Sequence, residues 1–598
     1  PRWADAGVGA AAYEDGATEV PAEVLLLRGT IQDIVRDGST GPAIAKRLRL
    51  LRRRVRRGGW RGRVDEQGQQ QLRTEVGRLV GIVALAARSF SAAHLCVTVD
   101  VLASLSTQQA FKDHLVFAGG SMVHALCDRA LRPEVLRRLD GKSMSRMIWA
   151  YGKIGLCKAE FIRGIGERMA GDALLHTLNA QDVSMTLWGL ARLRSADAWL
   201  VDALTGRIAY GAASLGEAPP APGGAVSLLS TFNAQDVANT VWALATLGVE
   251  KPVLMVALAD HVVQSPVLAT FTAKGISNTV WAYAKLGIRE EYLMAAIAQR
   301  LVQTDFLATF QPQNIANTAW AFAKLGVANE PLMHAVAHRI LRGNFVDRFN
   351  CKDIANTAWA YAMLDIPHRP LLDRFAQRMR QHRFLATFNS RALANTVWAF
   401  ARLGFDEART MNAVAERVTD RGFLHTFRPQ EVSNIAWAFA KRGISHTGLM
   451  DAVGEHLLQP EVLVAYSPHD VSHIAWAFAR LEYKNEAVMA VLATRMSQKE
   501  FMGTFNPQDT ANTAWAFAKL GIADEPLMEA IAEKTTDPGF LTTLQPQHIS
   551  NIAWAFASLG MRNEALTEAI ARRALDGDFF AGFNAQAMAD TAWAFGRL

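Results

Sequence analysis

Residues Phe505–Gly521 read FNPQDTANTAWAFAKLG, and nearly the same letters return at Phe310–Gly326 as FQPQNIANTAWAFAKLG. Twelve of the 15 tryptophans share this register, 39 residues apart except for one interval of 54: Trp149, Trp188, Trp242, Trp281, Trp320, Trp359, Trp398, Trp437, Trp476, Trp515, Trp554 and Trp593. Such a period is typical of stacked supersecondary units. We therefore expect one repeat array, and not the ~4 globular domains that length alone would suggest.

Each repeat carries the signals of two helices. Asn506-Pro507 suits an N-cap and a first helical position, and Gly521, about fourteen residues later, suits a left-handed C-cap. A second helix with an apolar stripe is expected from Asn329-Glu330-Pro331 and its counterparts, and a short segment such as Phe306–Phe310 leads to the next repeat. Because this region has no strand pattern, the predicted fold is all-α, an α-solenoid forming a right-handed superhelix of 39-residue helix-turn-helix repeats.

The chain is predicted to have three regions. Residues 1–70 would form an N-terminal segment with a basic, flexible arm, and residues 71–142 a helical region with degenerate repeats, of which His94–Leu105 is one candidate. Residues 143–598 would hold about twelve tandem repeats, the last one truncated. The interval of 54 contains GEAPPAPGG, which predicts a loop insertion near residues 211–227. Since the chain starts with Pro1 and ends inside a repeat, we expect it to be cut at both ends.

Composition narrows the class of protein. No run of 18 apolar residues lacks a charge, so no membrane partner is expected. The four cysteines form no CxxC pair, which argues against a disulfide framework and a zinc ribbon. The net charge of +7 arises in Lys46–Arg63, which holds ten cations and no acid, whereas the rest has 53 basic and 56 acidic residues. Binding of nucleic acid by the repeats would therefore depend on where their cations point.

A helical wheel of the first helix leaves one narrow polar strip. With Trp515 at zero, Gln508, Asn512 and Lys519 fall within the strip, Asp509 flanks it, and Ala516 is expected to keep it open. Nine of the twelve residues at the Lys519 position are cationic, which predicts a ladder of positive charge for phosphates: Lys153, Arg192, Lys285, Lys324, Arg402, Lys441, Arg480, Lys519 and Arg597.

Two neighbouring positions are the candidates for reading bases. The position seven before each Trp is polar or basic throughout, and the next one varies freely, including Gly275. Repeat proteins can read one base per repeat with two or three side chains. The predicted base-reading residues are Gln235, Asp236, Lys274, Gln313, Asn314, Lys352, Asp353, Arg391, Gln430, Glu431, His469, Asp470, Gln508, Asp509, Gln547 and His548.

The pattern FxPQxxANTxWAFAKLG at 39-residue spacing, over roughly Ser143–Leu598, resembles the octotricopeptide repeats of organellar RNA-binding proteins, which are similar in turn to FAST-kinase-like and RAP-domain proteins. The resemblance implies sequence-specific binding of single-stranded RNA, either transcripts or rRNA, in a chloroplast or mitochondrion. It also implies a role in RNA stability, processing or translation, with other proteins of such a complex as further partners. The first two repeats depart from the pattern, with Arg146 and Met185 in place of Asn, and no RAP domain is visible.

Structural explanations compete with these functional ones. We interpret the Trp column as core packing between repeats, without ligand contact. The Asn column at Asn512 could touch bases or form a buried amide ladder between repeats. The cation column could simply complement helix dipoles, although the second helices show no equally regular column. The runner-up function is a protein-binding scaffold, such as a structural subunit of an organellar ribosome.

Catalytic and metal chemistry find little support in the sequence. His469 and His473 have the i, i+4 spacing of a zinc pair but no third ligand in the adjoining repeats. No P-loop, HExxH, GxSxG or dinucleotide motif occurs. We therefore expect no enzyme activity, no cofactor and no metal.

Overall fold

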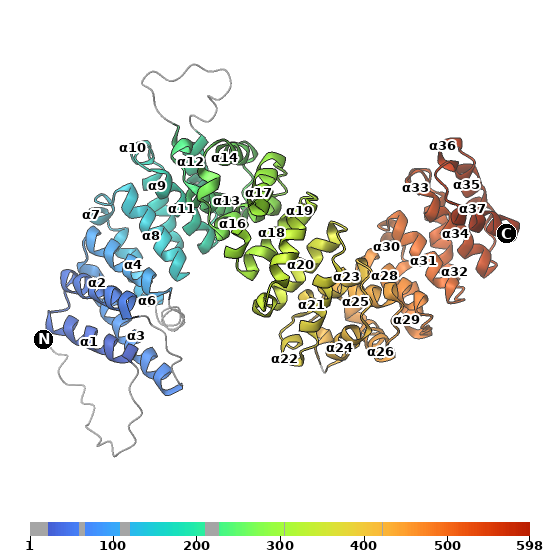
Figure 1. Ribbon diagram of the computed structural model, residues 1–598, viewed down its shortest axis with the longest axis horizontal. Helices are drawn as coiled ribbons and strands as arrows, with labels where there is room; N and C mark the ends of the chain where they lie inside the picture. The colour runs from blue at the N-terminus through green and yellow to red at the C-terminus, as the bar shows by residue number, and fades with distance from the viewer. Residues whose placement is uncertain are drawn as a thin grey trace, which may run out of the picture. The chain divides into compact units, whose positions relative to one another are not determined.

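The computed structural model describes residues 22–58, 66–107, 120–209, 227–303, 305–420 and 422–597, and all regular secondary structure in these ranges is helical (Figure 1). The chain divides into two compact units, Pro1–Leu286 and Gly287–Leu598. No described helix is both long and apolar enough to cross a membrane. The all-α solenoid predicted from the sequence is confirmed within each unit.

Every tryptophan of the 39-residue register lies on the first helix of a repeat. In unit 1 these helices are α8 (Gly141–Ile154), α11 (Ala180–Leu193), α13 (Ala234–Leu247) and α16 (Ala273–Leu286). In unit 2 they are α18 (Pro312–Lys324), α20 (Cys351–Met363), α23 (Ser390–Arg402), α25 (Pro429–Arg442), α28 (Pro468–Arg480), α31 (Pro507–Lys519), α34 (Pro546–Leu559) and α37 (Ala585–Arg597).

The helix ends follow the predicted signals. Asn506 caps α31 by accepting a hydrogen bond from the backbone N–H of Asp509, and Pro507 occupies the first helical position. After α31 and α34, Gly521 and Gly560 have φ of +67° and +68°, the left-handed conformation that glycine adopts without steric cost. The sequence therefore specifies where each first helix begins and ends.

The second helices start where the sequence predicts, with Asn329 and Asp524 as N-caps in their repeats. They are α9 (Ala159–Met169), α12 (Ala198–Ala209), α14 (Pro252–Gln264), α17 (Glu291–Gln303), α19 (Glu330–Leu341), α21 (Arg369–Met379), α24 (Ala408–Thr419), α26 (Thr447–Leu457), α29 (Glu486–Met496), α32 (Glu525–Thr536) and α35 (Glu564–Ala574). The returning segment is itself a short helix: α10 (Asp172–Leu175), η3 (Leu228–Thr231), α15 (Val267–Thr270), η4 (Asp305–Thr309), η5 (Phe345–Arg348), α22 (His382–Leu385), η6 (Leu424–Thr426), α27 (Pro460–Leu463), α30 (Lys499–Gly503), α33 (Pro538–Thr543) and α36 (Gly577–Phe580).

Within each unit the first helices of successive repeats pack closely side by side, and successive second helices touch less. Figure 1 shows this order in unit 2, where α18, α20 and α23 follow one another. The layer whose neighbours stand closest lies on the inner side of a curved stack. The first helices therefore line the inner surface of each unit.

The N-terminal region differs from the prediction at its basic stretch. Helices α1 (Ala22–Arg36), α2 (Gly41–Gly58) and α3 (Glu66–Ala86) pack together, and Leu48 and Leu51 of α2 are buried. Residues 46–58 are therefore a packed amphipathic helix and not the flexible arm that we expected, because its leucines supply a core face. The remainder of the basic stretch, residues 59–63, and the loop insertion expected near 211–227 (except its last residue) lie outside the described residues.

Helix α4 (Ala92–Leu105) contains the candidate decayed repeat. It packs against α8 and is followed by α6 (Gly120–Ala130) and the short α7 (Pro133–Leu136), the same order of helices as in a full repeat. This stretch therefore has the form of a repeat without its tryptophan.

Candidate functional site

One face of each first helix remains open to solvent. In α31 it consists of Gln508 and Lys519, which are exposed, and of Asn512 and Trp515, which are half-buried. Their spacing of four, three and four residues places them on one side of the helix. We call this row of four positions, repeated on every first helix, the Trp strip. Because first helices line the inner surface of each unit, the Trp strips lie on that surface.

The structure corrects two predictions about this face. The register tryptophans from Trp149 to Trp554 are half-buried and Trp593 is exposed, so the rings are part of the solvent-facing strip and not only of the core. Ala516, which was expected to keep the strip open, is fully buried. On the wheel Trp515 is adjacent to Asn512 and Lys519, so the position was correct and only its assignment to the core was wrong.

Tryptophans of neighbouring repeats pack against each other. The ring centroids of Trp188 and Trp242 in unit 1 are 6.2 Å apart with an interplanar angle of 32°. In unit 2 the centroid distances are 6.3 Å for Trp320–Trp359, 6.4 Å for Trp398–Trp437 and 6.3 Å for Trp476–Trp515. The strips of adjacent repeats are thus joined by aromatic contacts.

The predicted phosphate column is accessible. Lys153 is half-buried and Arg192, Lys285, Lys324, Arg402, Lys441, Arg480, Lys519 and Arg597 are exposed. Four of the cations, Lys153, Arg192, Arg402 and Arg597, lie 4.7–5.9 Å above the tryptophan of their own helix. Lys519 pairs with Glu482 at 3.0 Å, and Arg402 donates to the Ala362 carbonyl at 2.9 Å. Among the described residues Lys285, Lys324, Lys441 and Arg480 have no ion pair.

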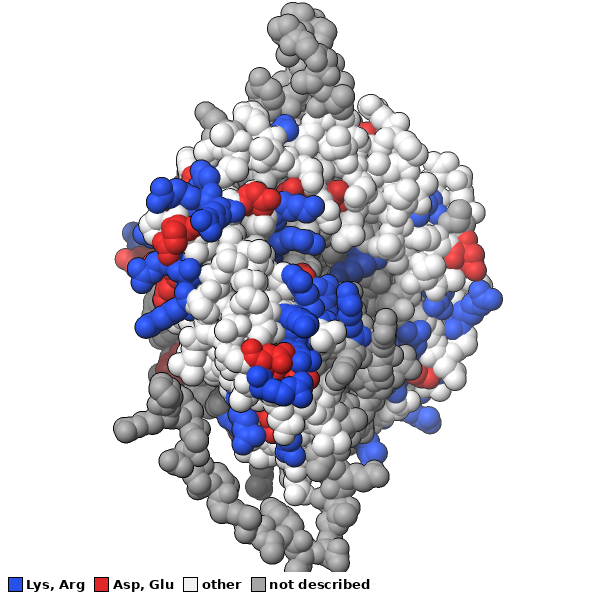
Figure 2. Space-filling view, turned by 90° about the vertical axis from the view of Figure 1, so that its left-hand side faces the viewer, with Lys and Arg blue, Asp and Glu red and all other residues white. Residues whose placement is uncertain are grey.

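Charges from distant repeats of unit 1 meet on the inner surface. The pKa of Lys153 on α8 is lowered, first by burial and then by the positive charge of Lys274 on α16, although α11 and α13 lie between these helices. The charge of Lys274 therefore contributes to the electrostatic potential at Lys153. Figure 2 shows Lys and Arg gathered in groups over the N-terminal helices.

The base-reading candidates divide into an exposed and a buried column. The position seven before each Trp is exposed at Gln235, Lys274, Gln313, Lys352, Arg391, Gln430, His469, Gln508 and Gln547. The next position is buried at Asp236, Asp353, Glu431, Asp470, Asp509 and His548, and Asn314 is half-buried. Since buried side chains cannot reach a base, the structure contradicts the prediction for this second column.

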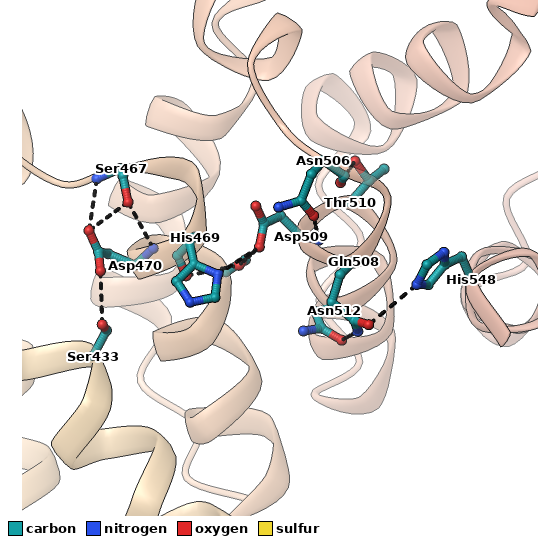
Figure 3. Close-up of polar contacts among 11 residues, drawn as sticks. Ser433, Ser467, His469, Asp470, Asn506, Gln508, Asp509, Thr510, Asn512 and His548 are labelled. Carbon is teal, nitrogen blue, oxygen red and sulfur yellow. Dashed lines mark hydrogen bonds and ion pairs between the residues drawn. The ribbon is translucent and has the colours of Figure 1, made fainter. Parts of the chain in front are cut away.

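The buried column caps helices and joins repeats. Asp470 accepts hydrogen bonds from Ser467 N at 3.1 Å and from Ser433 Oγ of the preceding first helix at 2.9 Å. Ser472 donates to Asp509 at 3.0 Å, and Ser184 donates to Asp236 at 2.7 Å, in the same arrangement. Figure 3 shows the carboxylates of Asp470 and Asp509 directed toward the neighbouring helix. We name this contact the Asp–Ser clamp. It supplies the inter-repeat polar link that an amide ladder of the Asn column, one of the two alternatives above, would have formed.

Two members of the Asn column, Asn512 and Asn551, make side-chain hydrogen bonds along their own helices. Gln508 donates to Asn512 at 2.8 Å, and Gln547 donates to Asn551 at 3.0 Å (Figure 3 shows the first pair). An amide ladder between repeats is not formed by these residues. The Asn side chains therefore belong to the Trp strip.

His469 and His473 form a pair of unlike histidines. A hydrogen bond from the His469 ring to Asp509 at 3.2 Å raises the pKa of His469. Burial and the neighbouring His469 lower the pKa of His473 to about 4, and its ring stacks on Trp437. In the described ranges no group of three or more His, Cys, Asp and Glu side chains is placed to hold a metal.

A second cation column went unnoticed in the sequence. Basic residues recur at 39-residue spacing on the second helices, with His456 at the one position that is skipped: Arg300, Arg339, Arg378, Arg417, Arg495, Lys534 and Arg573. The prediction that these helices show no equally regular column was therefore wrong. Each of these Lys and Arg residues lies 3.6–4.5 Å from the centroid of a phenylalanine of the following short segment. Arg339 also donates to the Leu307 carbonyl of the preceding repeat at 3.2 Å. The side chains of this column pack on phenylalanine rings of the protein itself, whereas the cations of the Trp strip face solvent.

Comparison with known families adds to this geometry. Residues 225–447 and 427–598 match the family of the RNA-editing substrate-binding complex 6 protein. The chain belongs to this family. RNA-editing substrate-binding complex 6 proteins are named for a complex that binds substrates of RNA editing, which agrees at a coarse level with the RNA-associated repeat protein expected from the sequence. The finer octotricopeptide and FAST-kinase-like assignments stay predictions.

No curated protein matches the chain. Two solved structures share 11% sequence identity with it and cover 97% of its length. They are a homology model of the full-length AP-3 complex in an intermediate open conformation, with a TM-score of 0.30 and 100% of that chain covered, and the pentatricopeptide repeat protein PPR10 from maize, with a TM-score of 0.32 and 97% covered. Scores at this level carry no argument about the ligand.

Proposed function

We propose that this chain binds single-stranded RNA along the Trp strips of its first helices and holds it as a substrate within an RNA-editing complex. The observation that carries the proposal is the composition of the strip: on the inner surface of each unit, every repeat presents an exposed polar or basic residue, a Trp that is half-buried or, at Trp593, exposed and, in most repeats, a Lys or Arg. Single-strand binders combine a positive groove for the backbone with aromatic rings on which bases stack.

The four positions take different parts in binding. Cations such as Lys324 and Lys441 neutralise phosphates, and the tryptophans offer ring faces to bases. The exposed column at Gln313 and Gln508 and the Asn column supply amide donors and acceptors for base edges. Because the exposed column differs from repeat to repeat, it is where sequence preference would arise. The proposed role is binding and not catalysis.

The location that goes with this role is an organelle, as the sequence resemblance implies, and the family match does not favour the chloroplast. Other proteins of an RNA-editing complex are the expected protein partners, since the family is named for such a complex.

Salt dependence of RNA binding tests this function. A 20-nucleotide mixed-sequence RNA is titrated with the full chain between 50 and 300 mM salt, and we expect the logarithm of the affinity to fall with a slope of about −0.7 per phosphate engaged. A slope corresponding to several phosphates supports the strip. Absence of RNA binding at 50 mM salt would leave the protein-binding scaffold as the better account.

A further inference from the structure

A polar pocket opens on the Trp strip between α13 and α16. Its volume is 510 Å³, within the usual range for small-molecule sites, and its lining includes Gln235 and Asn239 of α13 and Lys274 and Asn278 of α16. These four residues are the exposed and Asn-column positions of two adjacent strips. All of them lie in unit 1.

The pocket lies at a pair of repeats that has neither partner of the Asp–Ser clamp. Where α28 has Asp470, α16 has Gly275, and where α25 has Ser433, α13 has Ala238. Asp470 fills the space between its two helices and is buried, whereas Gly275 leaves the corresponding space open to the pocket that it lines. Gly275 is thus the member of this column without a side chain, and it lines the cavity.

Three of the four amide side chains that line this pocket have no hydrogen-bond partner in the part of the chain that the structure describes, whereas the fourth, Asn233, accepts from the backbone N–H groups of Gln235 and Asp236. Among the described residues, nothing hydrogen-bonds to the side chains of Gln235, Asn239 or Asn278, whereas Gln508 and Gln547 of later repeats are paired with the Asn of their own helix. Each free amide offers donors and an acceptor, the groups that pair with the edges of an unstacked base. The pocket therefore holds unused hydrogen-bonding capacity directed at a ligand.

Positive charge lies beside these amides. Lys274 lines the pocket. A cation in this position would attract a phosphate that follows or precedes a base.

We propose that this pocket receives one nucleobase turned out of the bound RNA strand, with its phosphate held by Lys274, so that binding is stronger and more base-selective here than along the rest of the strip. The inference rests on the proposed RNA binding. Gln235, Asn239 and Asn278 contact the base edge, and Gly275 determines specificity by leaving the space free.

The test replaces the missing side chain. Gly275→Asn adds an amide like that of Asn314, which occupies the equivalent position of α18 and accepts a hydrogen bond from the backbone N–H of Gln311. At the start of α16 the N–H of Gly275 donates to Thr272 Oγ1, so the added amide can accept from the Thr272 N–H in the same way. A Cβ at Gly275 would stand 3.1 Å from the Phe271 ring, but Ala392 is buried after Phe388 in the equivalent arrangement, so the position accepts a side chain. Circular dichroism and the melting temperature should therefore match the unsubstituted chain.

Binding of the 20-nucleotide RNA is then measured for the full chain, for Gly275→Asn and for the control Ala392→Asn, which adds the same amide at the same helical position of α23. We expect Gly275→Asn to weaken binding roughly tenfold, the worth of one well-contacted base, and Ala392→Asn to leave it unchanged. A second variant, Asn278→Asp, places a negative charge at the pocket without filling it and should weaken binding by a similar factor.

The outcomes separate the two proposals. If the unsubstituted chain binds RNA and Gly275→Asn and Asn278→Asp bind it equally well, the pocket takes no base although the strip does bind RNA. Equal weakening by Gly275→Asn and Ala392→Asn would also overturn the pocket, because the effect would then be general to the column. If the unsubstituted chain binds no RNA, the proposed function itself fails.

Discussion

Removal of the Asp470 side chain should loosen the contact between α25 and α28 by a calculable amount. Asp470 is 5% exposed and accepts hydrogen bonds from Ser467 N, Ser467 Oγ and Ser433 Oγ at 3.1, 2.6 and 2.9 Å. Ser467 is the N-cap of α28 and Asp470 its partner in the capping box, so loss of the Asp470 side chain removes its half of the box, worth about 1 kcal/mol. A hydrogen bond to a charged group is worth about 1.5–3 kcal/mol. Since Ser433 can turn to the Gln430 carbonyl at 3.1 Å, we expect Asp470→Ala to cost about 2–3 kcal/mol.

Asp353→Ala is the matched control. Asp353 is also 5% exposed and caps α20 through Asn350 N, but Ala316 stands where the clamp serine would be. This variant therefore loses the cap alone, and its cost should be smaller by about 1–2 kcal/mol. A Ser433→Ala and Asp470→Ala double-mutant cycle should give a coupling energy of about 1 kcal/mol.

Native-state hydrogen exchange of the amides of α25, α28 and α20 is the suitable assay, because repeat arrays do not always unfold in one step. Protection should fall in α25 and α28 for Asp470→Ala and mainly in α20 for Asp353→Ala. Equal losses in the two variants, or a coupling energy near zero, would refute the clamp as an inter-repeat link.

Two further predictions concern a histidine and an arginine. The pKa of His473 is lowered to about 4 in the folded chain, whereas in the unfolded chain it lies near 6.5. Because the unfolded chain then takes up a proton that the folded chain does not, the free energy of unfolding should fall as pH is lowered from 6.5 toward 4. His473→Asn introduces the residue that most other repeats have and should remove up to about 2 kcal/mol of the loss of stability between pH 6.5 and 5, as measured by thermal melts. His469, whose pKa is raised, acts in the opposite direction and is present in both proteins. An unchanged pH profile of stability in the variant would contradict the lowered pKa of His473. Arg339→Met should lower the free energy of unfolding by about 1–2 kcal/mol, because it removes the contact with the Phe345 ring and the hydrogen bond to the Leu307 carbonyl. Its RNA affinity should be unchanged. A loss of affinity with normal stability would indicate that RNA binds the second helices.

The fold could be predicted almost completely because the repeat period and the residues at the helix ends indicate the same arrangement of helices. The tryptophan period gives the repeat, Pro507 and Gly521 mark the ends of the first helix, and Asn329 and Asp524 begin the second. The short third helix was missed because segments such as Phe306–Phe310 are too short for helical periodicity to show. The basic helix α2 was missed because its charges concealed the apolar face formed by Leu48 and Leu51.

The candidate site could be predicted only in part. The wheel gave the positions of Gln508, Asn512 and Lys519 correctly, since helix geometry alone determines which residues share a face. It could not show that Asp509 is buried, because that depends on the serine of the preceding helix, nor that Trp515 is half open, because a large ring can serve the core and the surface together. The pocket at Gly275 needs both neighbouring helices and is invisible in one repeat.

Charge reversal on the Trp strip tests the central claim most directly. Lys324, Lys441 and Arg480, which are exposed and without ion pairs among the described residues, are replaced together by Glu in the full chain. A control variant carries Arg342→Glu, Arg409→Glu and Arg572→Glu, which changes the net charge equally at exposed positions of the second-helix layer. With circular dichroism unchanged, the strip variant should lose binding to the 20-nucleotide RNA while the control retains most of it; equal losses in both, or none in the strip variant, would contradict RNA binding by the Trp strips.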